Sequence, residues 1–152
     1  MKCEMKIIII TIVVLISSAA QAETDDLDSF LADYLNAFGL AQDVSKYFVS
    51  SPQFIFGDHL LIPASRKEAG EVLKDILTRL KQSEYAETKI MESTLRAKLD
   101  SYSLVSLLLH RYKTNGELLD KVCSSYGVLN GERGYEIISW QPSNVNAEGR
   151  CE

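Results

Sequence analysis

Apolar residues recur at helical spacing in two parts of the chain. The first stripe predicts a helix that Gly39 ends, since glycine readily takes the left-handed conformation after a last turn. Its members are Leu27, Phe30, Leu31, Tyr34, Leu35 and Phe38. The second stripe follows the capping box Ser65 to Glu68 and predicts a longer helix. Its members are Ala69, Val72, Leu73, Ile76, Leu77 and Leu80. Between them, Val44, Tyr47 and Phe48 suggest a short third helix before Pro52.

Strand patterns occupy the rest of the chain. Residues 54–56 and 60–62 predict a short hairpin around Gly57, Asp58 and His59. From Tyr85 to Trp140 the pattern has period two, and Asp100-Ser101, Asn115-Gly116 and Asn130-Gly131 interrupt it. Helices that precede antiparallel strands indicate an α+β domain with the helices on one face of the sheet.

The Asn115-Gly116 pair predicts a hairpin with these two residues at its tip, both at positive φ. Thr114 then faces Glu117, and Arg111 falls opposite Asp120. Continuing down the strands pairs Leu109 with Val122, Leu107 with Ser124 and Val105 with Tyr126, on a face that we assign to the interior. The opposite face, which includes His110 and Cys123, is mixed, as a solvated or partner-covered face would be.

Arg111 and Asp120 therefore have two interpretations. A salt bridge at the rim of the sheet is the structural one, worth about 0.2–1 kcal/mol when partly exposed. The functional one is an arginine that meets an anionic ligand group at a pocket mouth, because its fork binds carboxylates bidentately.

The N-terminus has the three parts of a secretory signal peptide. Lys2 and Lys6 precede an apolar run over residues 7–16, and small residues end in Ala20-Gln21-Ala22. The run is shorter than the roughly 20 apolar residues of a membrane-spanning helix. We therefore predict cleavage between Ala22 and Glu23, no stable membrane anchor afterwards, and an exported protein, either periplasmic or secreted.

The predicted mature chain is one acidic domain of ordinary size. Removing Lys2, Lys6 and Glu4 from the 16 basic and 21 acidic residues leaves a formal charge of −6. No basic cluster fits nucleic acid. We expect the domain over residues 23–141 and a polar, disordered tail over residues 142–152. Cys123 and Cys151 remain after cleavage, and export allows a disulfide between them; the alternative is one half-buried thiol in a strand and one loose thiol in the tail.

The order of elements resembles the nuclear transport factor 2-like superfamily, which includes SnoaL-like polyketide cyclases and ketosteroid isomerases. The resemblance rests on DLDSFLADYLNAF, SRKEAGEVLKDILTRL, LLLHRYKTNGELLDKVCSSYGVL and GYEIISW, which follow one another over nearly the whole mature chain. It implies a cone-shaped α+β barrel with three helices, in which a curved antiparallel sheet wraps around the N-terminal helix. It also implies a pocket at the wide end and a homodimer through the outer face of the sheet.

The resemblance implies a pocket whose candidate residues are Tyr34, Arg111, Asp120, Tyr126 and Tyr135. Enzymes of this superfamily use a carboxylate on the inner face, and here Asp120 and Tyr126 are the candidate catalytic residues. A neighbouring Arg111 would lower the pKa of Asp120, and such a carboxylate is a poor base near neutral pH. Asp58 and His59 are more typical of a turn, and His110 faces outward. The sequence has no metal or cofactor motif, so we expect neither.

Three functions remain open. We favour an exported domain that binds a small apolar molecule without assured catalysis. The alternatives are an isomerase, dehydratase or cyclase acting on a carbonyl-bearing apolar substrate, and a structural dimerisation domain with a filled cone.

Overall fold

The computed structural model describes residues 26–151, so the predicted leader and its cleavage site lie outside the described residues. The chain divides into two units, which meet between Leu31 and Ala32. Residues 26–39 are helical, and all the other elements belong to the second unit. Within residues 26–151, no helix has the length and apolar character needed to cross a membrane.

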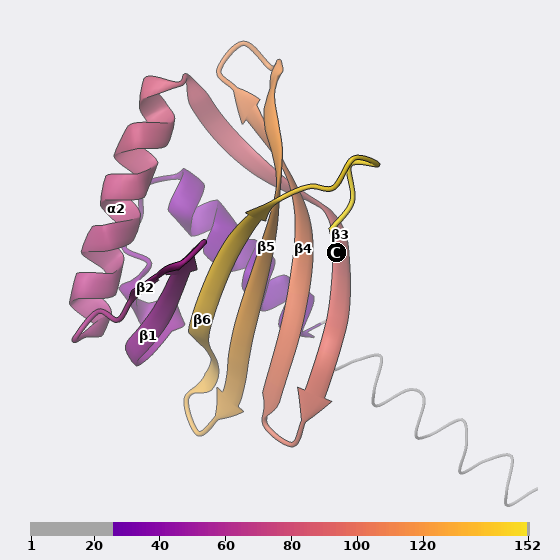
Figure 1. Ribbon diagram of the computed structural model, residues 1–152. Helices are drawn as coiled ribbons and strands as arrows, with labels where there is room; N and C mark the ends of the chain where they lie inside the picture. Colours follow the sequence, from indigo (N-terminus) through magenta and orange to yellow (C-terminus); the bar gives the residue numbers. More distant parts are fainter. Residues whose placement is uncertain (1–25, 152) are drawn as a thin grey trace, which may run out of the picture. The chain divides into compact units, whose positions relative to one another are not determined.

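The second unit is built on a curved, mixed sheet of six strands in the order β2-β1-β6-β5-β4-β3 (Figure 1). The strands are β1 (Phe48–Phe56), β2 (His59–Leu61), β3 (Tyr85–Leu99), β4 (Tyr102–Lys113), β5 (Leu118–Gly131) and β6 (Gly134–Asn144). All neighbours are antiparallel except β1 and β6, which run parallel. The prediction of a wholly antiparallel sheet was therefore wrong at this pair, whose connection contains a helix and four strands and leaves no local turn signal.

The second predicted helix is present as α2 (Arg66–Gln82), which lies beside β1 and β2 in Figure 1. Ser65 caps it by accepting a hydrogen bond from the Glu68 amide at 3.1 Å. The Glu68 carboxylate reaches back to accept from the Ala64 amide at 2.7 Å. The sequence signature SRKE thus forms a reciprocal cap, one residue wider than the standard capping box.

The third predicted helix is absent from the described residues. Only a single 3-10 turn, η1 (Ser45–Tyr47), forms there, and Phe48 already begins β1. Pro52 lies inside β1, at an irregularity in its pairing with β6, instead of marking a boundary. Proline is tolerated in a strand where the ladder is interrupted, which is why Pro52 was misread as a breaker.

The central hairpin has the predicted register along most of its length. Arg111 faces Asp120, Leu109 faces Val122, Leu107 faces Ser124 and Val105 faces Tyr126. The leucine and valine positions of β4 on this inner face are at most 4% exposed. The predicted interior face of the sheet is therefore confirmed.

The tip of the hairpin differs from the prediction. The Lys113 amide donates to the Glu117 carbonyl, so the loop contains Thr114, Asn115 and Gly116. Only Gly116 has a positive φ, of 83°. The pairing shifts between Arg111 and Tyr112, which compensates for the longer loop. Thr114 consequently does not face Glu117, and the two-residue turn was wrong, because Asn-Gly also suits a three-residue loop with glycine in the left-handed position.

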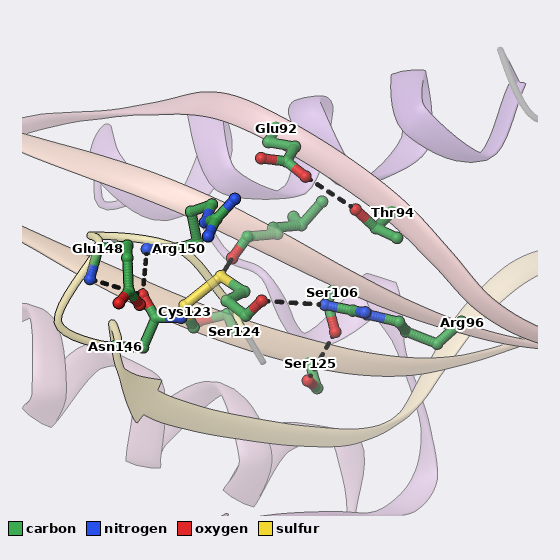
Figure 2. The surroundings of a disulfide bond; sticks show 12 residues. Glu92, Thr94, Arg96, Ser106, Cys123, Ser124, Ser125, Asn146, Glu148 and Arg150 are labelled. Carbon is green, nitrogen blue, oxygen red and sulfur yellow. Dashed lines mark hydrogen bonds between the residues drawn. A yellow bond between two sulfur atoms is a disulfide. The ribbon is translucent and has the colours of Figure 1, made fainter.

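The C-terminal residues fold back onto the outer face of the sheet (Figure 2). Cys123 of β5 is bonded to Cys151, which decides the alternative that the sequence left open. Asn146 accepts hydrogen bonds from the amides of Glu148 and Arg150, and Arg96 of β3 donates to the Cys151 carbonyl at 3.3 Å. The segment expected to be disordered therefore begins as β6, which runs to Asn144, and continues as a held turn.

Candidate functional site

A cavity of about 300 Å³ lies on the inner face of the sheet, within the unit of residues 32–152. Residues of the first helix, α2 and five strands form its wall. They are Tyr34, Leu35, Phe38, Phe56, Leu73, Ile76, Leu80, Thr88, Leu109, Arg111, Val122, Ser124, Tyr126, Trp140, Pro142, Ser143 and Asn144. Most of these side chains are apolar, which is typical of a pocket for a small organic molecule.

The floor of the cavity is a hydrogen-bonded aromatic cluster. Tyr34 and Tyr126 are 2% and 1% exposed, and their rings meet edge to face at 5.9 Å between centroids. Their hydroxyls share a hydrogen bond, and Tyr126 is also bonded to Ser124. The indole N–H of Trp140 donates to the Ser124 hydroxyl at 3.3 Å. These polar groups therefore satisfy one another, as buried polar groups must.

Burial controls the protonation of this floor. Desolvation raises the pKa of Tyr34 well above its usual value and raises that of Tyr126 as well. The phenolate form would lose its hydration without gaining a cation in contact. Both tyrosines consequently stay neutral at physiological pH and offer hydroxyl groups, not bases.

The rim of the cavity is polar and carries its one charged wall residue, Arg111. The guanidinium donates Nε–H to Asp120 at 2.6 Å, and its Nη2 forms a second bond to the other carboxylate oxygen. Thr88 faces Arg111 across β3 and β4, and its hydroxyl bonds to Tyr85 at 2.9 Å. Asn144 of β6 faces Val122 of β5 and also lines the rim.

The wall contains no aspartate, glutamate, histidine, lysine or cysteine among the described residues. Proton abstraction needs a group that can accept a proton near neutral pH within hydrogen-bond reach of the substrate. The wall's titratable groups are Tyr34 and Tyr126, kept protonated by burial, and Arg111, which is always charged. The cavity is thus equipped to bind and orient a molecule more than to move a proton.

The structure brings together three of the five predicted pocket residues. Tyr34, Arg111 and Tyr126 line the cavity, as the resemblance implies. Asp120 stands behind Arg111 and is outside the wall, and Tyr135, which pairs with Asn130 near the start of β6, is outside it as well.

The other candidates lie on the surface or the outer face. Asp58 and His59 contact each other at 3.3 Å in the β1–β2 turn, both more than four-fifths exposed. His110 faces outward beside Tyr112. No group of three or more metal-ligating side chains occurs within residues 26–151.

Sequence reasoning missed several wall residues. Trp140 and Asn144 lie on β6, where register shifts on both sides hide which face a residue occupies. Ile76 and Leu80 belong to the apolar stripe of α2, from which the sequence predicted a helix but no cavity wall. Their half-buried state shows that the stripe is wider than the core it covers. The sequence did contain one signal for these two wall residues. The apolar stripe of α2 is wider than is needed to cover a packed core.

The fold and this cavity define a class of protein, the α+β domains with a curved sheet and a pocket on its inner face. The chain belongs to the NTF2-like protein family DUF6841, which matches residues 23–145. Among curated proteins, none matches.

Solved structures share the fold at low sequence identity. An NTF2-like protein with a cystatin-like fold from Novosphingobium aromaticivorans aligns with a TM-score of 0.67, at 9% identity over 88% of this chain and 89% of its own. A domain of unknown function from Nostoc punctiforme gives 0.65, at 14% identity over 84% and 80%. A dehydratase candidate of the NTF2-like family from Streptomyces avermitilis gives 0.65, at 12% identity over 84% and 99%. At such identities the likeness shows the fold alone.

Proposed function

We propose that this protein is an exported, non-catalytic binding domain for a small, mainly apolar molecule. The observation that carries the proposal is an apolar cavity of about 300 Å³ whose wall has three titratable residues, none of which can act as a base. The volume is at the small end of the range for ligand pockets, so we expect a ligand of about a dozen heavy atoms.

The layout of the wall supports entry from one side. The floor residues Tyr34, Leu73 and Tyr126 are fully buried. Phe56, Ile76 and Trp140, which also line the cavity, are only half-buried. Burying a ligand between them removes apolar surface from water at both partners, which stabilises the complex by about 25 cal/mol per Å² before the cost of association.

An enzyme acting on a carbonyl-bearing substrate is the weaker alternative. A dehydratase candidate is among the structural neighbours of this chain, but that likeness is one of fold. Asp120, the predicted catalytic carboxylate, is bonded twice to Arg111 and does not reach the wall. Turnover of a carbonyl substrate that Asp120→Asn abolishes in a folded protein would reverse this preference.

Export is the second part of the proposal, and the disulfide supports it. A bond between Cys123 and Cys151 persists in an oxidising compartment and is rare where thiols are kept reduced. Residues 1–22 have the sequence pattern of a signal peptide, which would direct the chain to export.

Trp140 offers a direct test of binding, since it is the chain's single tryptophan and lines the cavity. We expect propylbenzene to change its fluorescence in a saturable way. Val122→Phe adds a ring to the cavity wall and should weaken binding about tenfold, which corresponds to about 1.4 kcal/mol. Leu129→Phe, on the outer face of the same strand, is the matched control and should bind like the wild type. No saturable change in wild-type protein, or equal binding by Val122→Phe, would refute the proposal.

A further inference from the structure

We infer that the ligand's polar end is an uncharged hydrogen-bond acceptor, such as an amide or ketone carbonyl, and that the site discriminates against carboxylates. This inference rests on the proposed function, because it concerns the same cavity. The juxtaposition that carries it is Arg111 in the wall with Asp120 already bound to it from behind.

Asp120 uses one edge of the guanidinium. It accepts from Nε and Nη2, so both of its oxygens are engaged in the side-on arrangement of a bidentate pair. The Arg111 Nη1 has no hydrogen-bond partner among residues 26–151. The side chain is only 21% exposed, so this nitrogen is an unpaired donor on a largely buried residue of the cavity wall.

The charge at this rim is already balanced. Arg111 contributes one positive charge to the wall and Asp120 cancels it, and no lysine, histidine or second arginine lines the cavity within the described residues. A ligand carboxylate would therefore leave one net negative charge in a partly buried site, close to another carboxylate. A like charge nearby and desolvation both disfavour an ionised carboxylate.

A neutral acceptor has neither cost. It can accept from the free Nη1, and a hydrogen bond to a charged donor is stronger than one between neutral groups. Asn144, Ser143 and Thr88 are the other polar residues at this rim, and all three are uncharged. The rim thus provides hydrogen bonds without net charge.

Two ligands of the same shape test the inference. We would titrate wild-type protein at neutral pH with 3-phenylpropanamide, 3-phenylpropanoate and the apolar parent propylbenzene, using Trp140 fluorescence and calorimetry. The amide should bind at least tenfold more tightly than the carboxylate. Asp120→Asn keeps the shape and a hydrogen-bond acceptor but removes the charge, so it should strengthen carboxylate binding about tenfold and leave amide binding within about twofold.

Glu117→Gln is the matched control, since it removes one negative charge from the exposed tip of the same hairpin. It should leave the amide-to-carboxylate ratio unchanged. The inference is overturned if wild-type protein binds the carboxylate as tightly as the amide, a result that does not depend on any variant folding. It is also overturned if folded Asp120→Asn keeps the wild-type ratio. Binding of propylbenzene in either case leaves the proposed function intact, whereas failure of all three ligands refutes both.

Discussion

At the scale of single residues, the two buried tyrosines are the most constrained polar groups of the cavity. Tyr34 and Tyr126 bond to each other beneath the space that a ligand would fill. Each phenol must remain neutral there, because an ionised oxygen would be buried without a compensating charge. The folded state is therefore stable only while the hydroxyls of both tyrosines remain protonated.

This coupling predicts a loss of stability in alkali. Burial raises both tyrosine pKa values above the value of about 10 for an unfolded chain. The contribution of these neutral tyrosines to the free energy of unfolding is complete below pH ~10. It is lost as the pH rises above ~10, because the unfolded chain then releases protons that the folded protein retains. The free energy of unfolding should fall by up to about 1.4 kcal/mol per pH unit for each tyrosine. Urea unfolding from neutral pH to beyond pH ~10 measures the slope.

Phenylalanine variants separate this effect from general alkaline unfolding. Tyr126→Phe should be less stable at neutral pH by about 1–3 kcal/mol, since partners of its hydroxyl remain buried. Its decline above pH ~10 should be shallower than that of the wild type. Tyr112→Phe removes a hydroxyl from the outer face and should keep the wild-type slope. Parallel slopes for wild type and Tyr126→Phe would contradict the account.

Which residues could be placed from the sequence depended on distance from a recognisable turn. Arg111 and Asp120 were paired correctly because only a few residues separate them across the hairpin tip. The loop was nevertheless one residue longer than predicted, and a bulge restored the register. Trp140 and Asn144 could not be assigned to the cavity, since the pairing of β6 with β5 shifts between Gly127 and Val128, nearer the turn than these two residues.

At the scale of elements, bulges limit what alternation can predict. The pairing of β3 with β4 shifts at three places, so residues that alternate evenly in sequence do not stay on one face. Met91 and Leu99, which share a face in the period-two pattern, are 52% and 70% exposed. These irregularities also protect the free edge of a long strand, because a bulged edge is a poor template for another chain.

The C-terminal tail is the element whose stability rests most on a single bond. The disulfide closes a segment of 28 residues, for which chain entropy predicts about 3.6 kcal/mol of stabilisation. Cys151→Ser should therefore lower the free energy of unfolding by about 2–4 kcal/mol in urea titrations. A phosphine reductant should bring wild-type protein to the level of the variant and leave the variant itself unchanged. Equal stability of the oxidised wild type and Cys151→Ser would show that the disulfide adds nothing to stability.

At the scale of the whole molecule, the family fold and the contents of its cavity give different information. Membership of the NTF2-like family explains a curved sheet with a pocket on its inner face, yet the fold hosts several chemistries. In this chain the wall of the cavity has one charged residue, Arg111, and its neutralising partner Asp120 lies outside the wall. The proposal of binding without proton transfer rests on these side chains, not on the fold.

Export and homodimer formation stay predictions, and one measurement tests both. Native mass spectrometry of protein secreted by a host cell should show an assembly of two copies, in which each chain begins at Glu23 and carries the disulfide. Leu104 and Leu108 support the dimer, since both lie on the outer face and are only half-buried, Leu108 beside the disulfide-bonded Cys123. Ala22→Arg should retain the leader because cleavage requires a small residue. Leu104→Lys should give single copies, whereas Leu60→Lys, on the exposed strand β2, should not. An intact leader with free thiols would refute export, and single copies of the wild type at micromolar concentration would refute the dimer.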